Sequence, residues 1–187
     1  MGKIYFILFD LIRSSKILTQ LIWHVKIETK LHNVFWDLTS LVLKKEITTI
    51  KNKKKFLDMG CGQFALIGQF FKKKNLNSDV VAVDIYSEFV NNSIKNVKFN
   101  NINLRIIKSN LFSNLKYEKF DLISFNPPYV PTKRDDNEKR FKKIRYSGND
   151  GTLITSKFLD QVKKHLLPHG QILLGVNTFY VSQKKMH

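Results

Sequence analysis

The sequence predicts an α/β fold with a mostly parallel sheet, because short apolar runs alternate with helical patterns from residue 56 onward. Strands at this spacing, separated by helices, form right-handed βαβ units and lie parallel in one sheet. The expected strands are 56–59, 79–83, 104–108, 120–125 and 171–177, and the expected helices are 64–73, 87–99 and 152–166. A turn at 167–170 is expected between the last helix and the fifth strand.

The residues before the first expected strand have a different pattern. Apolar side chains recur at helical spacing through residues 1–30, which predicts a helix or a pair of helices. Residues 34–47 are expected to form a loop and then a helix, with Asp37 or Thr39 as its N-cap. We therefore divide the chain into an N-terminal helical segment, 1–33, and a main domain, 34–187.

Length and composition bound the class of protein. The chain has 187 residues, of which 43% are hydrophobic, enough for one domain with its own core. No apolar run approaches the ~20 residues that span a bilayer, so we expect a cytoplasmic protein without a membrane contact. The single cysteine, Cys61, excludes an intramolecular disulfide framework, and the histidines show no metal-ligand spacing, so no metal is expected.

The formal net charge of +17 is large for this length. Such an excess of Lys and Arg favours a polyanionic partner, such as RNA, DNA or the ribosome. The chain is also rich in Lys, Asn and Ile together, a bias that AT-rich coding would produce without any functional cause. The charge leaves both interpretations open.

A glycine-rich turn follows the first expected strand. Gly60, Cys61 and Gly62 lead from that strand into a helical pattern, and glycines let a backbone approach a ligand closely beside the free N–H groups of a helix start. The second expected strand ends at Asp84, about 20 residues further on, where an acidic residue is the usual partner of ribose hydroxyls.

The sequence Asn126-Pro127-Pro128-Tyr129, which we call the ledge, follows the fourth expected strand. Each proline fixes its own φ and donates no hydrogen bond, so the carbonyl groups there are held in place. The Asn126 side chain offers one acceptor and two donor hydrogens, and the Tyr129 ring can stack on a flat group. The ledge suits a planar substrate that carries an NH2 group, such as adenine, cytosine or a glutamine side chain.

The segment 130–151 is the only long irregular stretch that the sequence predicts, and it carries many basic residues. A run of this length without regular structure is usually functional or disordered. Its position directly after the ledge predicts that it forms one wall of the substrate pocket, and a solvated surface loop is the alternative.

These motifs, in this order, resemble those of class I S-adenosylmethionine-dependent methyltransferases with an Asn-Pro-Pro-Tyr motif. Within that class the chain is most similar to the HemK family, which methylates the glutamine amide of peptide-chain release factors. The resemblance covers about residues 34–177 and implies a Rossmann-like, three-layer sandwich. The short C-terminus implies that the last strands of this fold are shortened or missing.

The resemblance also implies roles for individual residues. Cofactor contacts would come from Asp58, Gly60, Cys61, Gly62, Asp84, Ile85, Asn110, Leu111 and Asn126. Asn126, Pro127 and Tyr129 would be catalytic, and together with Pro128 they would bind the substrate. The implied partner is a release-factor-like protein. A nucleic acid is the alternative substrate, and a weakly active cofactor-binding protein that acts through a partner is the third hypothesis.

The chain departs from the family pattern at two positions in the cofactor region. Phe64 stands where the family has a third glycine, and Asn110 stands where it has an aspartate. A residue other than glycine at position 64 must keep a negative φ or accept strain. We expect the ring of Phe64 either to crowd the cofactor turn or to pack in the core.

Overall fold

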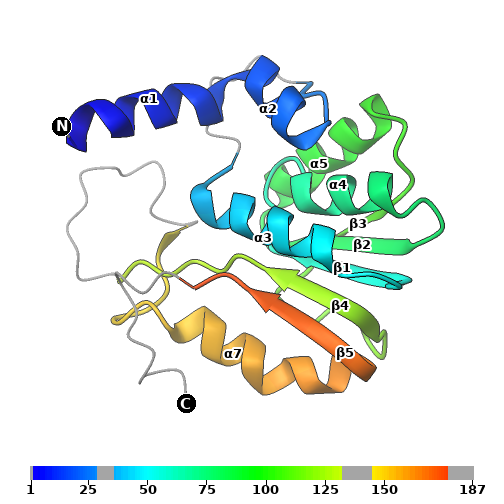
Figure 1. Ribbon diagram of the computed structural model, residues 1–187. Helices are drawn as coiled ribbons and strands as arrows, with labels where there is room; N and C mark the ends of the chain where they lie inside the picture. The colour runs from blue at the N-terminus through cyan, green and yellow to red at the C-terminus, as the bar shows by residue number, and fades with distance from the viewer. Residues whose placement is uncertain (1, 29–35, 132–144, 177–187) are drawn as a thin grey trace.

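Figure 1 shows the computed structural model, which describes residues 2–28, 36–131 and 145–176. Its centre is a five-stranded sheet in the order β3-β2-β1-β4-β5, in which all neighbouring strands pair parallel. The strands are β1 (Lys55–Met59), β2 (Asp79–Asp84), β3 (Arg105–Lys108), β4 (Phe120–Phe125) and β5 (Leu166–Leu174). The expected α/β fold with a mostly parallel sheet is confirmed.

Helices cover both faces of this sheet. They are α1 (Gly2–Ser14), α2 (Lys16–Trp23), α3 (Leu38–Thr49), α4 (Leu66–Lys74), α5 (Ser87–Phe99) and α7 (Leu153–Val162), followed by the short 3-10 helix η2 (Lys163–His165). The N-terminal pattern thus forms a pair of helices. Asp37 is the N-cap of α3, because its Oδ1 accepts the backbone N–H of Ser40 at 2.8 Å.

Two apolar cores lie on opposite sides of the sheet, as the alternation of side chains along a strand requires. Phe56 and Val80 belong to the core under α3 and α4, whereas their neighbours Leu57 and Val81 belong to the core under α7. The first core also takes in Trp23 at the end of α2. The result is the expected three-layer sandwich.

The boundaries of the last strand differ from the prediction. The predicted turn at 167–170 lies within β5, which begins at Leu166 and pairs with Phe120 before its register shifts to Leu122↔Gln171. Between these two pairs β5 advances by more residues than β4, so β5 bulges. His169 lies in the bulge and has a φ of 62°. A proline and a glycine in this segment indicated a turn, whereas the structure forms a bulge.

Some predictions fall on residues outside the described ranges. These are the division between residues 33 and 34, the centre of the irregular segment at 132–144, the last residue of the predicted fifth strand and the chain beyond it. Among the described residues, no helix combines the length and the apolar character that crossing a membrane requires.

Candidate functional site

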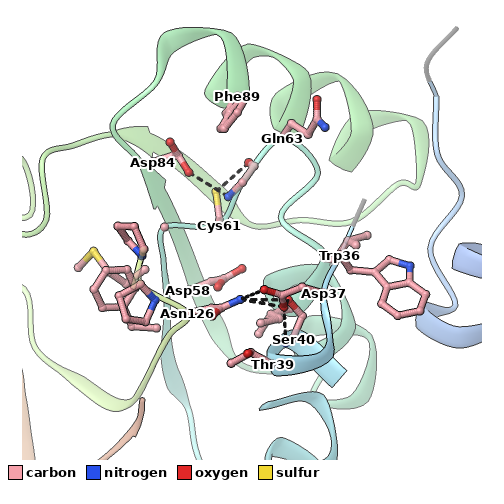
Figure 2. A pocket seen from close by; sticks show the side chains of 18 of the residues that line it. Trp36, Asp37, Thr39, Ser40, Asp58, Cys61, Gln63, Asp84, Phe89 and Asn126 are labelled. Carbon is pink, nitrogen blue, oxygen red and sulfur yellow. Dashed lines mark hydrogen bonds between the residues drawn. The ribbon is translucent and has the colours of Figure 1, made fainter. Parts of the chain in front are cut away.

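A cavity of about 540 Å³ lies at the carboxyl ends of β1, β2 and β4, within the size range of ligand pockets. Figure 2 shows it with Asp84 and Cys61 on one side and Asn126 beside Asp37 on the other. The cavity is lined by every site residue that the sequence predicted: Asp58, Gly60, Cys61, Gly62, Asp84, Ile85, Asn110, Leu111, Asn126, Pro127, Pro128 and Tyr129. Parallel strands bring these residues together because their carboxyl ends meet at one edge of the sheet.

The glycine turn adopts backbone angles that favour glycine. Gly60 and Gly62 have φ values of 62° and 67°, in the left-handed region. A Cβ on Gly60 would also lie 3.0 Å from Cε2 of Phe125, whereas a Cβ on Gly62 would stand in open space. The turn is tied to β2 by a 2.9 Å hydrogen bond from the Cys61 N–H to the Val83 carbonyl. Gly62 therefore exposes its backbone directly to the cavity.

Asp84 braces this turn from the end of β2. Its Oδ2 accepts the Gly62 N–H at 2.9 Å, and its Oδ1 accepts the Tyr86 N–H at 3.0 Å. Burial raises the pKa of the carboxyl group, and the backbone hydrogen bonds oppose that rise. A carboxylate has about four lone-pair sites, so the side chain can accept a ligand hydroxyl while it holds the turn.

Asp58 lies deeper, at the base of the same turn, and is 2% exposed. Its Oδ2 accepts the Gly68 N–H of α4 at 2.9 Å, and its Oδ1 lies 3.4 Å from the Ser124 hydroxyl. Burial raises the pKa of Asp58 to about 7, and these two contacts oppose the rise. The carboxyl group therefore titrates near neutral pH at the wall of the cavity.

The ring of Phe64 packs in the core, and the residue also lines the cavity. The residue keeps a negative φ, and its ring is 3% exposed in the core with Ile67 and Phe70. The left-handed conformation falls instead on Ala65, with a φ of 45°, directly before α4. The expected helix start at residue 64 is therefore wrong by two residues, because this additional turn precedes the helix.

The remaining cofactor candidates follow β2 and β3. Ile85 is 48% exposed, and Asn110 is also exposed at the cavity. Leu111 has a φ of 49°, which a branched hydrophobic residue rarely adopts. The Ser109 hydroxyl donates to the Leu111 carbonyl at 2.7 Å and holds this turn. Backbone strain of this kind is common at ligand sites.

Asn126 is held by residues that the sequence interpretation did not place in the site. Its Nδ2 lies 3.0 Å and 3.2 Å from the two carboxylate oxygens of Asp37 and 3.3 Å from the Ser40 hydroxyl. Its Oδ1 is buried and has no hydrogen-bond partner among the described residues. A buried acceptor without a donor costs about 1–3 kcal/mol, and native structures retain few of them.

The N-terminal helices supply another wall that the sequence interpretation did not assign. Phe9 and Arg13 of α1 line the cavity, as does Trp36, which also belongs to the first core. Trp36 donates its indole N–H to the Thr19 hydroxyl of α2 at 3.0 Å and meets the ring of Phe9 edge-on. These contacts join segments that are far apart in sequence, so periodicity alone could not reveal them.

The irregular segment contributes to the cavity through its described end. An isolated parallel bridge joins Val130 to Tyr146, and Arg145 and Tyr146 line the cavity beside Tyr129. The part of the predicted wall that the structure describes is therefore present.

The arrangement of this cavity in a parallel sheet is that of a class I S-adenosylmethionine-dependent methyltransferase. More particularly, the chain belongs to the methyltransferase small domain family, whose model matches residues 31–187. Open space beside Gly62, with Asp84 next to it, fits a cofactor of this kind.

Two curated relatives illustrate the similarity. A putative protein N5-glutamine methyltransferase of Methanocaldococcus jannaschii is 34% identical over 149 residues, which are 78% of this chain and 74% of that protein. A release factor glutamine methyltransferase of Francisella tularensis is 34% identical over 137 residues, 68% of this chain. The chain spans about half (48%) of the length of this bacterial relative.

The solved structures show the same fold. A methyltransferase from Pyrococcus furiosus aligns with a TM-score of 0.64 at 20% identity, over 99% of this chain and 81% of that one. At this identity the likeness concerns the fold alone.

Proposed function

We propose that the protein transfers a methyl group from S-adenosylmethionine to the side-chain amide of a protein glutamine, in a release-factor-like substrate. The observation that carries this proposal is the Asn126 amide, whose Nδ2 is anchored and whose Oδ1 lacks a donor at the wall of the cavity. A substrate NH2 group would supply that donor. The names of both relatives support glutamine as the acceptor.

The residues of the cavity would hold the cofactor in three places. The turn of Gly60, Cys61 and Gly62, with Asp58 below it, would hold the methionine end. Asp84 and Ile85 would contact the ribose, and Asn110 and Leu111 would flank the adenine. When bound, the cofactor supplies an electrophilic methyl group on a sulfonium.

The ledge would prepare the substrate nitrogen. An amide NH2 is a poor nucleophile because its lone pair is delocalised. The Asn126 Oδ1 and the Pro127 carbonyl would each accept one N–H, orient the nitrogen toward the methyl group and stabilise the positive charge that develops on it. The Tyr129 ring would stack on the flat amide. Because Oδ1 is buried, we expect its neighbours to shift slightly when the substrate enters.

The distribution of charge bears on the alternative substrates. Exposed lysines flank the amino ends of the strands, which form the edge opposite the cavity. We call them the amino-edge lysines: Lys51, Lys54, Lys55, Lys73, Lys74, Lys116, Lys119, Lys163 and Lys164. Tyr117 lies among them and is 94% exposed. This surface favours an RNA or ribosome contact away from the cavity.

Methyl transfer from labelled S-adenosylmethionine tests the proposal. We expect label in a purified bacterial release factor, on a glutamine located by mass spectrometry, and none in RNA. Asn126→Ala should abolish transfer while the affinity for S-adenosylhomocysteine stays within about tenfold, because its main contact is with the transition state. Label only in RNA would establish the nucleobase alternative, and cofactor binding without transfer to either would favour the weakly active protein.

A further inference from the structure

Asp37 and Ser40, at the start of α3, form hydrogen bonds with the side-chain amide of Asn126, which follows β4. Asp37 and Asn126 are 89 residues apart in sequence. Both oxygens of the Asp37 carboxylate accept hydrogen bonds from Asn126 Nδ2, and the Ser40 hydroxyl oxygen accepts from the same nitrogen. Figure 2 shows these three side chains converging at one point of the cavity wall. The contact joins a helix of one layer to the ledge.

The chemistry of the groups fixes which way the amide faces. A carboxylate only accepts hydrogen bonds, so the edge of Asn126 that faces Asp37 must be its NH2 group. The Ser40 hydroxyl donates its one hydrogen to Asp37 Oδ1 at 2.7 Å, and so toward Asn126 it too can only accept. Both neighbours therefore exclude the flipped amide, in which Oδ1 would face two acceptors. The carbonyl oxygen is left as the group without a partner.

Asp37 is itself held rigidly. Its Oδ1 caps α3 by accepting the Ser40 N–H at 2.8 Å, so the carboxylate is part of the helix end rather than a mobile surface group. A helix cap needs only one short acceptor, and the second oxygen lies 3.2 Å from Asn126 Nδ2. The contact between Asp37 Oδ2 and Asn126 Nδ2 does not contribute to the helix cap.

We propose that Asp37, assisted by Ser40, is a positioning residue for methyl transfer. The carboxylate locks the Asn126 amide in one orientation, presents Oδ1 as the acceptor for the substrate NH2, and draws charge toward that oxygen through its own hydrogen bonds with Nδ2. This inference rests on the proposed function, in which Asn126 Oδ1 receives the substrate.

Asp37→Ser separates positioning from capping. Serine caps a helix as well as aspartate, but its side chain is too short to keep the contact with Nδ2. We expect kcat to fall about 10–100-fold, the scale of losing a group that orients a site residue. KM and cofactor affinity should stay within about threefold. Asp37→Asn keeps one acceptor oxygen and should recover part of the loss.

Ser15→Ala is the matched control, because Ser15 caps α2 through the Leu18 N–H and touches no residue of the ledge. If it lowers kcat as much as Asp37→Ser does, general loosening explains the effect and the proposal fails. Equal melting temperatures for the variants under comparison establish that they are folded.

A readout without turnover keeps this inference separate from the proposed function. The side-chain NH2 signals of Asn126, assigned by their absence in Asn126→Ala, should exchange slowly with water in the wild type and in Ser15→Ala. They should exchange at least tenfold faster in Asp37→Ser. Unchanged exchange would overturn the inference even if methyl transfer is observed. If the Asn126 NH2 group exchanges slowly but the protein methylates no release factor, the proposed function is overturned, whereas the hold of Asp37 on Asn126 is established.

Discussion

Asp58 illustrates how much one side chain can depend on its surroundings. Its carboxyl group is almost completely buried between β1 and α4, and burial raises its pKa to about 7. In the unfolded chain the same group titrates near its ordinary value of 3.8. Because the folded pKa is the higher one, the native state holds the proton more tightly than the unfolded state between these values.

This difference predicts a pH dependence of stability. The contribution of Asp58 is fully present below about pH 4 and is lost as the pH rises through about 7. At about 1.4 kcal/mol per pKa unit, the wild type should lose on the order of 4 kcal/mol relative to Asp58→Asn across that window. Urea denaturation of both proteins between pH 4 and 8 measures the difference, and parallel stability curves would contradict it.

The stability of a Phe64 variant tests whether this single side chain acts through the core. Because its ring lies in the core with Phe70, Phe64→Ala should lower the free energy of unfolding by about 3–5 kcal/mol. Cofactor affinity of the folded fraction should change less than threefold. Phe99→Ala, at a ring that is 48% exposed, is the control and should cost far less. Tighter cofactor binding without a loss of stability would instead mean that the ring crowds the turn.

At the scale of the elements, Gly175 follows β5 and lies between Thr39 of α3 and Asn126, which follows β4. A Cβ on Gly175 would lie 2.4 Å from the Thr39 methyl carbon and 3.1 Å from Asn126 Oδ1. Only a residue without a side chain lets the backbone pass at this point. The contact places Gly175 beside the oxygen that the proposed mechanism uses.

Gly175→Ala should therefore lower kcat, by about tenfold or more, because it displaces groups next to Asn126 Oδ1. Thr39→Ser removes the methyl group that the new Cβ would meet and keeps the hydroxyl. The double variant should recover much of the lost rate, and Thr39→Ser alone should be nearly neutral. Additive losses in this double-mutant cycle, measured by methyl transfer, would refute the steric explanation.

The sequence predicted the order of the elements well because each strand and helix carries its own hydrophobic period. It also placed all the predicted site residues at one cavity, since parallel strands end at a common edge. It could not show the contact of Asp37 with Asn126, because a helix cap explains an aspartate at that position fully. Nor could it show the bulge in β5, since a proline followed closely by a glycine is also typical of a turn.

At the scale of the molecule, the amino-edge lysines of the described residues lie at the edge of the sheet opposite the cavity. Tyr117 lies between Lys116 and Lys119 in the sequence. Acidic residues at this edge are already engaged: Glu118 and Asp79 pair with Arg105, and Asp121 accepts the N–H groups of Lys54 and Lys55. Basic side chains around an exposed aromatic ring suit single-stranded RNA, which they would bind through phosphates and base stacking. A contact at this edge would leave the cavity open to a protein substrate.

Lys116→Glu with Lys119→Glu should weaken RNA binding and lower the slope of its salt dependence by about two, one for each lost phosphate contact. The control is Lys16→Glu with Lys108→Glu, which makes the same change of net charge at exposed positions away from this edge. Filter binding of ribosomal RNA at several salt concentrations gives both quantities. Equal losses in the two double variants would mean that only the net charge matters.

The packing of α2 and of Trp36 against the cavity has a practical consequence. The chain contains two tryptophans, and both line the cavity: Trp23 is fully buried at the end of α2, and Trp36 is 5% exposed beside Phe9. All indole emission of the protein therefore originates at the wall where a ligand would bind. Intrinsic fluorescence should report occupancy without any attached dye, and a titration could follow binding in real time in a stopped-flow instrument.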